Sequence, residues 1–296
     1  MTNLRRVAAI LSVLTVAASL RVAAQEPIYP GDPRWNNDPV NSGATAVTTA
    51  ANPYLGNASL ELNLAGSLFD WGFYMRLAGA PESSSWGLLS AVETLGFAWY
   101  RDLLPIPSTV ASNDPFHVQS PVFRLVVRDQ VGDQTVYSHL VWEYWYNQDG
   151  RAPADQFAYG EWFEEDMINQ VFWRHLAEPS DQLLYTNGGC LDEAFAGRDL
   201  LTRATVSGWS ACYSPTAVVW GVMVGVGSNW PAAFTGYVDH VQLGFAGDQI
   251  QTVNDNFEFP PETAVPEPAT LVLLGSGLAA LVAVARFRRR GAALQG

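Results

Sequence analysis

Apolar and polar residues alternate with a period of two along the middle of this 296-residue chain. The pattern, or a long run of β-branched and aromatic residues, occurs in six segments: 60–64, 95–99, 123–127, 137–146, 217–226 and 235–245. Clusters of Gly, Pro, Asn and Asp separate these segments, which is typical of short strands. The pattern predicts an all-β protein, a two-sheet β-sandwich of the jelly-roll type, with a signal helix at the N-terminus and a single transmembrane helix at the C-terminus.

One segment fits two descriptions. Between Glu161 and Leu176 the apolar residues recur at helical spacing, but the stretch also reads as two short strands. We favour strand–turn–strand, with the turn near Asn169 and Gln170.

The first 24 residues have the layout of a secretory signal peptide. Arg5 and Arg6 precede an apolar run from Val7 to Leu20, and small residues precede a cleavage site between Ala24 and Gln25. A run of this length is short for a membrane span, so cleavage is expected and an uncleaved anchor is the alternative.

The C-terminal segment from Val265 onward has three parts in a fixed order. A proline-rich stretch precedes an apolar run, 269–285, which is long enough for a short transmembrane helix, and an arginine cluster follows. The arginines keep the tail in the cytoplasm by the positive-inside rule. The residues of the first and last parts are Val265, Pro266, Glu267, Pro268, Arg286, Arg288, Arg289 and Arg290.

This order resembles the PEP-CTERM sorting signal of Gram-negative bacteria. The resemblance implies recognition by an exosortase-type sorting protease, transient anchoring in the inner membrane, cleavage near Pro266–Pro268 and export to the cell surface or extracellular matrix. It also implies a link with exopolysaccharide and biofilm. A plain C-terminal anchor is the alternative.

These signals divide the chain into five parts. We expect a signal peptide at 1–24, an extended lead-in at 25–58, the β-sandwich domain at 59–259, a linker at 260–265 and the sorting signal at 266–296.

Charge and composition exclude several functions. All 16 basic residues are arginines, so lysine-dependent phosphate loops and Schiff-base chemistry are excluded. The formal net charge of −13 repels phosphate backbones, which argues against a nucleic-acid partner.

The strand Gly236–Phe245 carries an aromatic-Val-Asp-x-Val pattern. It resembles the terminal strand of bacterial galactose-binding-like and carbohydrate-binding jelly rolls. Asp239 falls on the same strand face as Tyr237, Val241, Leu243 and Phe245, so we expect its carboxylate to point toward the core. The resemblance implies a structural calcium held by Asp239 and Glu61. An arginine partner, Arg76 or Arg101, or backbone N–H groups are the alternatives.

Acidic and aromatic residues supply the candidates for ligand contact. Glu164, Glu165 and Asp166 belong to the densest acidic cluster and are the candidates for glycoside hydrolysis, although we favour a solvated loop as their explanation. Trp86, Trp209 and Trp230 lie among Ser, Gly, Asn and Pro, which predicts exposed loop tryptophans that stack on sugar rings.

Cys190 and Cys212 are the only cysteines, and an exported chain favours a disulfide between them. The four histidines show no metal-ligand spacing, and no nucleophile elbow is present.

Together these features favour an exported, non-catalytic β-sandwich that associates with extracellular polysaccharide. A glycan-active hydrolase or lyase and a purely structural matrix protein are the alternatives.

Overall fold

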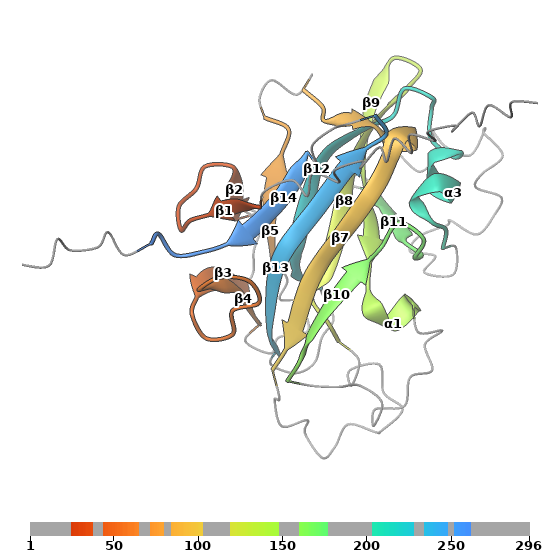
Figure 1. Cartoon of the computed structure of the whole chain (residues 1–296). Helices are drawn as coiled ribbons and strands as arrows, with labels where there is room; N and C mark the ends of the chain where they lie inside the picture. Colours follow the sequence, from red (N-terminus) through yellow and green to blue (C-terminus); the bar gives the residue numbers. More distant parts are fainter. Residues whose placement is uncertain are drawn as a thin grey trace, which may run out of the picture.

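A computed structural model describes residues 25–37, 44–64, 72–79, 84–102, 119–147, 160–176, 203–227, 234–247 and 252–261. Two seven-stranded sheets pack face to face, and in Figure 1 the sheet with β7, β10 and β13 lies in front of the sheet with β8, β9 and β12. The predicted all-β sandwich is confirmed.

We call the first sheet sheet A. Its strands are β1 (Glu26–Ile28), β3 (Ala44–Thr49), β4 (Ser59–Leu64), β7 (Val92–Arg101), β10 (Trp162–Asp166), β13 (Phe234–Phe245) and β14 (Val253–Phe257). β13 lies in the middle, with β7 and then β10 on one side. Its other side pairs with β4 along its first half and with β14 along its second half.

We call the second sheet sheet B. Its strands are β2 (Trp35–Asn37), β5 (Gly72–Leu77), β6 (Gly87–Leu88), β8 (Val122–Val131), β9 (Gln134–Trp142), β11 (Trp173–Leu176) and β12 (Val218–Val226). In the described part of the chain, three short helical turns accompany the sheets: η1 (Leu89–Ala91), α1 (Tyr144–Asn147) and α3 (Val206–Ser210).

The apolar positions predicted from the alternation form the core between the sheets. Leu60, Leu62 and Leu64 of β4 pack there, as do the inward residues of β7 and β8. The segment Glu161–Leu176 is strand–turn–strand, with residues 168–170 in the turn. Its two strands join different sheets, since β10 pairs with β7 and β11 pairs with β9.

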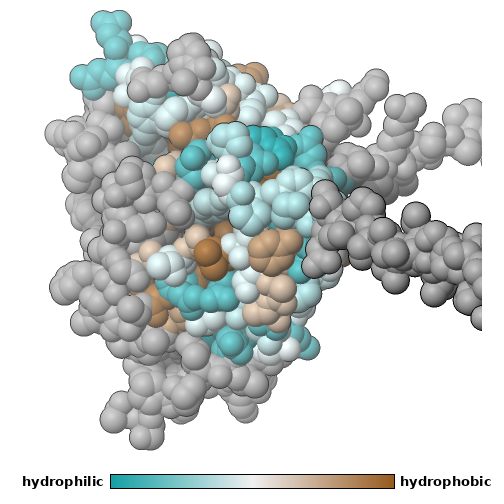
Figure 2. Space-filling view, turned by 90° about the vertical axis from the view of Figure 1, so that its left-hand side faces the viewer, coloured by the Kyte–Doolittle hydropathy of each residue, from teal (hydrophilic) through white to brown (hydrophobic). Residues whose placement is uncertain are grey.

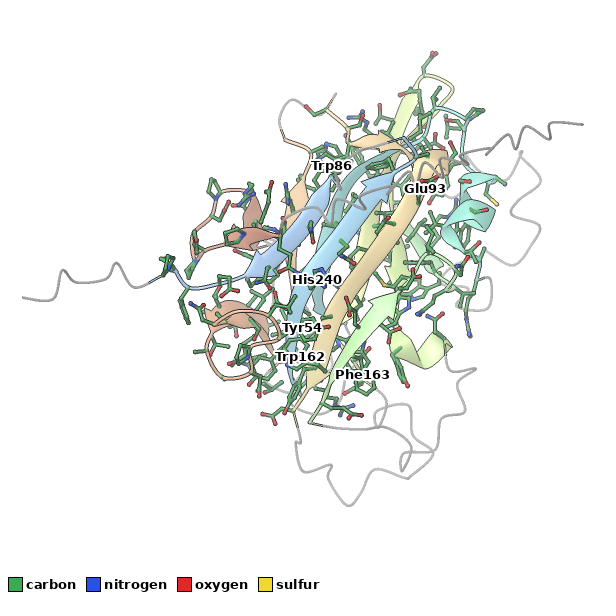
Figure 3. The ribbon with its side chains drawn as sticks, viewed as in Figure 1. Tyr54, Trp86, Glu93, Trp162, Phe163 and His240 are labelled. Carbon is green, nitrogen blue, oxygen red and sulfur yellow. The ribbon has the colours of Figure 1, made fainter. Side chains whose placement is uncertain are left out.

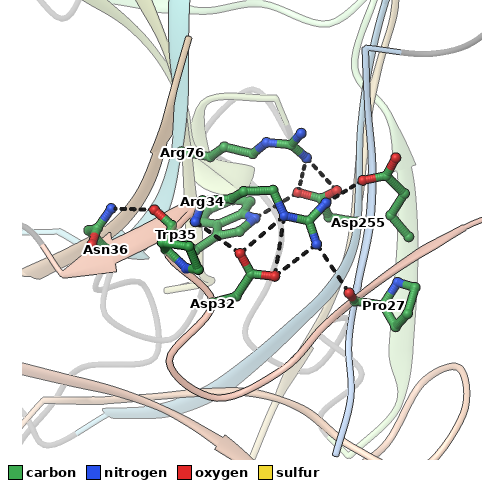
Figure 4. A network of polar contacts seen from close by, with 9 residues as sticks. Pro27, Asp32, Arg34, Trp35, Asn36, Arg76 and Asp255 are labelled. Carbon is green, nitrogen blue, oxygen red and sulfur yellow. Dashed lines mark hydrogen bonds and ion pairs between the residues drawn. The ribbon is translucent and has the colours of Figure 1, made fainter. Parts of the chain in front are cut away.

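The described residues between 25 and 58, namely 25–37 and 44–58, belong to the sandwich, whereas the sequence predicted an extended lead-in before it. β1 pairs with β14 of sheet A, and β2 pairs with β5 of sheet B, so the segment crosses from one sheet to the other. Trp35 is buried, and its Nε1–H donates to Asp255 Oδ2 at 2.6 Å (Figure 4). Arg76 pairs with the same carboxylate. Such short strands escape detection because three residues carry almost no periodicity.

Figure 2 shows the side of the molecule that carries the N-terminal strands β1–β4. Hydrophobic residues occur there as small, separate patches between hydrophilic ones. Val47 of β3 is among the few large apolar side chains on the described surface, with 56% of it exposed. Single exposed residues of this kind are normal and do not define an interface.

Candidate functional site: a groove on the outer face of sheet A

Three strands align their side chains across the outer face of sheet A. The register of β10, β7 and β13 places residues in three cross-strand rows. The rows are Trp162–Tyr100–Tyr237, Glu164–Ala98–Asp239 and Asp166–Gly96–Gln242. Because successive side chains of a strand alternate between faces, Trp162, Glu164 and Asp166 all point outward from β10. Figure 3 shows Trp162, Tyr54 and His240 on this face.

Aromatic rings occupy one end of these rows. The Trp162 ring lies 5.0 Å from the Tyr54 ring and 5.7 Å from the Tyr100 ring, measured between centroids. Tyr100 makes an edge contact with Tyr237 at 5.5 Å. Trp162 and Tyr100 are each partly exposed, so this cluster presents ring surface to solvent next to polar groups.

Glu164 links the aromatic end to the polar residues of β13. The Tyr54 hydroxyl donates to Glu164 Oε2 at 2.9 Å, and Glu164 Oε1 lies 3.0 Å from His240 Nδ1. Burial, followed by the hydrogen bond to Glu164, raises the pKa of Tyr54 to about 12. Gln242 Nε2 lies 2.8 Å from His240 Nε2. These contacts connect the His240 ring to Glu164 on one side and to Gln242 on the other.

A β-bulge presents His240 to this face. Asp239 pairs with Ala98 and Gln242 pairs with Gly96, so β13 has one residue more than β7 between these rows. His240 has φ of +48°, and no other non-glycine residue in the described ranges has a positive φ. Positive φ costs an L-residue energy, and such residues persist where the surroundings enforce them, often at functional sites. Bulges likewise re-aim side chains beside binding sites.

The bulge also changes which residues of β13 face the core. Phe234 and Val238 pack into the core before it, whereas Val241, Leu243 and Phe245 do so after it. The prediction that Tyr237 and Asp239 share a face with these last three residues is therefore wrong. A single extra residue reverses the alternation, and no turn residue in the sequence marks it.

Asp239 is fully buried and stabilises the bulge. Its Oδ1 accepts from the backbone N–H groups of His240 at 2.9 Å and Phe257 at 2.8 Å, and its Oδ2 accepts from Leu55 N–H at 3.3 Å. Burial raises the pKa of Asp239 to about 7, against the lowering effect of these donors. Of the three sequence-based explanations, the backbone N–H groups match this geometry.

The residues named in the other two explanations, an arginine partner and a calcium site, contact other groups. Arg76 pairs with Asp255, and Arg101 donates to the Gln119 carbonyl oxygen at 2.7 Å. Glu61 accepts from Asn63 on its own strand. Within the described ranges, no three or more His, Cys, Asp or Glu side chains gather as a metal site. Calcium binding by Asp239 and Glu61 stays a prediction.

A pocket of about 470 Å³ opens beside the acidic residues of β10. Its lining residues are Glu93, Thr94, Leu95, Glu164, Glu165, Asp166, Ile168 and Gln242. Gly96 lies next to it, and a Cβ at this position would stand 2.7 Å from the Glu165 carbonyl oxygen. Glycine therefore allows β10 to approach β7 closely here. We call the surface formed by Tyr54, Tyr100, Glu93, Trp162, Glu164, Asp166, His240 and Gln242 the β10 groove.

The predicted acidic cluster is divided between the two faces of β10. Glu164 and Asp166 lie on the groove side. The Glu165 carboxylate accepts from Trp99 Nε1 at 3.3 Å and from Gln170 Nε2 at 2.7 Å, on the opposite side. Gln170 also accepts from Trp142 Nε1 at 2.5 Å. Glu165 therefore connects β10 to the packed interior.

Two of the three predicted tryptophan contacts, Trp86 and Trp209, are not in the groove. Trp209 was expected on an exposed loop, but Thr205 caps the short helix α3 and Trp209 points into the core, where its Nε1–H donates to the Phe172 carbonyl oxygen at 2.8 Å. Trp86 is half-buried and packs against the core next to β12 of sheet B, well above Trp162 in the view of Figure 3. Trp230 lies outside the described residues.

The structure describes one of the two cysteines that were predicted to form a disulfide. Cys212 follows α3 and packs against the core, whereas Cys190 lies outside the described ranges. Their disulfide stays a prediction.

Sequence reasoning missed Tyr54, Trp162 and His240. Trp162 carried a usable signal, because it alternates with Phe163 and so shares a face with Glu164 and Asp166. Tyr54 lies in the segment predicted as lead-in, and its contact with Glu164 spans 110 residues of sequence. No local pattern predicts such a contact.

Comparison with known proteins identifies the C-terminal signal. Residues 264–290 match the PEP-CTERM protein-sorting motif. This is an exported protein. The motif is a membrane-anchored sorting signal at the C-terminus of the chain, as the sequence predicted. In the part of the chain that the structure describes, no helix has the length and apolar character to cross a membrane, and the predicted span 269–285 lies outside that part.

Solved structures similar to this exported protein are carbohydrate-binding modules. One solved chain, from work on carbohydrate-binding modules of the β-sandwich superfamily, has 12% identity to this chain and a TM-score of 0.27. The match covers 71% of this chain and 56% of the solved chain. A family 11 module of a Clostridium thermocellum cellulosomal cellulase has 10% identity over 76% of this chain and 96% of its own, with a TM-score of 0.35.

The family 11 module of the same organism in complex with a β-1,3-1,4-mixed-linked tetrasaccharide has 10% identity over 77% of this chain and 93% of its own, with a TM-score of 0.33. None of these proteins is similar enough to transfer functional residues to this chain. No curated protein shows significant sequence similarity to it.

Proposed function

We propose that this exported protein binds extracellular polysaccharide through the β10 groove and does not cleave it. The observation that carries the proposal is the position of Trp162. Its partly exposed ring lies between Tyr54 and Tyr100 and on the same strand face as Glu164 and Asp166. An aromatic face beside hydrogen-bonding groups matches a sugar ring, which has apolar C–H faces and a polar rim.

The placement of the carboxylates supports binding without catalysis. Glycosidases hold two carboxyl groups on opposite sides of the scissile bond. Here Glu164 and Asp166 lie two residues apart on β10, Glu93 comes from the adjacent strand β7 of the same sheet, and the Glu165 carboxylate points away. The three groove carboxylates therefore come from one sheet. Glu164 is also engaged by Tyr54 and His240.

The sorting signal supports a proposal for where the protein is processed and where it acts. An exosortase-type protease is the expected processing partner, with the inner membrane as a transient anchor. The processed protein then associates with polysaccharide at the cell surface or in the matrix of a biofilm. The acidic chain gives no reason to expect nucleic acid as a partner.

Affinity electrophoresis of the exported, processed protein in gels that contain extracellular polysaccharides tests the proposal. Trp162→Ala should weaken retention about tenfold, which corresponds to about 1.4 kcal/mol. Trp86→Ala removes a tryptophan outside the groove and should leave retention unchanged, with thermal unfolding checking that both variants fold.

Three outcomes count against the proposal. Equal retention of wild type and Trp162→Ala would show that the groove is not the binding site. Release of sugar products that Glu164→Gln or Asp166→Asn abolishes would favour the hydrolase or lyase instead. No retention on any polysaccharide, together with ordered oligomers in native mass spectrometry, would favour a purely structural matrix protein.

A further inference from the structure

The two sheets of the sandwich carry opposite formal charge. The strands of sheet A contain eight acidic residues and one arginine. The strands of sheet B contain four arginines and one acidic residue. The sheet A acids are Glu26, Glu61, Glu93, Glu164, Glu165, Asp166, Asp239 and Asp255, and the sheet B arginines are Arg76, Arg124, Arg128 and Arg174.

Three of the four exposed acids of sheet A lie in the β10 groove. Glu93, Glu164 and Asp166 are exposed and line the pocket. The fourth, Glu26, lies outside the groove and pairs with Arg34, whereas Asp239 and Asp255 are fully buried. The one arginine of sheet A is Arg101, which is 4% exposed and follows Leu95, Phe97 and Trp99 on the inward side of β7. No arginine is among the residues that line the pocket.

This arrangement constrains the ligand chemically. A uronic acid, sulfate or phosphate group in the groove would meet three carboxylates, and among the described residues that line the pocket no guanidinium is present to pair with it. Repulsion between such like charges lowers affinity. A protonated amine would instead form charge-assisted hydrogen bonds to carboxylates that are already exposed.

We propose that the β10 groove selects glycans with free amino groups, that is, polymers of de-N-acetylated hexosamine, over neutral and anionic glycans. This inference rests on the proposed function, because it names the ligand class of the same groove. His240 bounds the groove on the β13 side and holds Glu164 in place, so Asp166 and Glu93 are the carboxylates left to receive the amines.

Isothermal titration of the exported, processed protein with four tetrasaccharides tests the inference. The probes are a glucosamine tetramer, at a pH where its amines are protonated, an N-acetylglucosamine tetramer, cellotetraose and a uronic acid tetramer. The glucosamine tetramer should bind about tenfold more tightly than the N-acetylated one. The difference should shrink as salt is raised from about 0.01 to about 1 M, because salt screens exposed charges.

Matched variants assign the effect to the groove. The double variant Glu93→Gln with Asp166→Asn keeps shape and hydrogen bonding but removes two charges, so it should abolish the preference for the amine and leave binding of the N-acetylated tetramer unchanged. Glu61→Gln removes a charge from the same sheet outside the groove and should leave the preference intact.

The outcomes separate the two proposals. Equal binding of the amine and N-acetyl probes, or tighter binding of the uronic acid probe, overturns the charge selection while glycan binding stands. A preference that survives in the double variant also overturns it. No binding of any probe overturns the proposed function and this inference together.

Discussion

At the scale of single residues, His240 shows how backbone and side chain are connected in this fold. The bulge leaves backbone N–H groups without ladder partners, and Asp239 accepts from the one at His240. The same bulge aims the imidazole ring at Glu164, with the Tyr54 ring stacked on it at 6.4 Å. One extra residue in β13 thus explains three features: the positive φ of His240, the buried Asp239 carboxylate and the position of the His240 ring in the groove.

Substitution of His240 measures the strain separately from the side-chain contacts. Both His240→Gly and His240→Ala remove the ring, but only glycine accepts φ of +48° without a clash. We expect the glycine variant to be more stable than the alanine variant by about 1 kcal/mol. Urea unfolding of the two proteins checks this. An alanine variant as stable as the glycine variant would show that the backbone is unstrained.

The raised pKa of Asp239 predicts a pH dependence of stability. Burial raises this pKa from its ordinary value of 3.8 to about 7, so between these pH values the folded protein holds a proton that the unfolded chain has lost. The stability that Asp239 contributes therefore falls as the pH rises from about 4 through about 7.

Comparison with Asp239→Asn isolates this group, because burial also raises the pKa of Asp255 and the pKa of Glu143 in both proteins. The free energy of unfolding of wild type minus that of the variant should be larger at pH 5 than at pH 8. Urea titrations at the two pH values provide the measurement. If the difference in free energy of unfolding between the two proteins is the same at pH 5 and pH 8, Asp239 keeps an ordinary pKa.

At the scale of elements, the long strands were predictable and the short ones were not. Residues 60–64, 95–99 and 123–127 alternate over enough positions to specify both strand and buried face, and all three are core strands. β1 and β2 have three residues each, and burial of Trp35 between the sheets stabilises them. Local sequence patterns do not reveal tertiary contacts of this kind.

The candidate site was predictable only in part. The acidic residues of β10 were found because their density is a property of the sequence. Their separation into Glu164 and Asp166 on one side and Glu165 on the other follows from the strand, and only the structure places Tyr54 and His240 beside them. Trp209 was misplaced because Ser and Gly around it indicate a loop as readily as a capped helical turn.

Trp35 should anchor the N-terminal strands. Trp35→Phe keeps most of the ring volume but removes the donor to Asp255, whose carboxylate is fully buried. Loss of this bond should lower the free energy of unfolding by about 1–3 kcal/mol. Asn36→Ala, at the exposed neighbouring position, should change it by less than about 0.5 kcal/mol. Equal effects of the two substitutions in chemical denaturation would contradict an anchoring role.

At the scale of the whole molecule, the sorting motif and the predicted signal peptide define the processed protein. We expect it to begin at Gln25, one residue before β1, and to end near Pro266. Intact mass of the exported form measures both ends. Neutralising Arg288, Arg289 and Arg290 should impair orientation of the tail and reduce export of the processed form. An exported form that retains these arginines would contradict cleavage at the motif.

The end of β14 has a consequence for the reach of the domain while its tail is attached. Asn57 Oδ1 accepts from Phe259 N–H at 2.8 Å, and Asn57 N–H donates to Glu258 Oε2 at 2.7 Å, so the folded part extends to Phe259. The sorting motif begins at residue 264, and the predicted transmembrane span begins at residue 269, ten residues after Phe259. Ten residues span at most about 36 Å when fully extended. While the tail is attached, Phe259 therefore stays within about 36 Å of the membrane, and only polysaccharide that comes this close to the lipid surface can reach the domain.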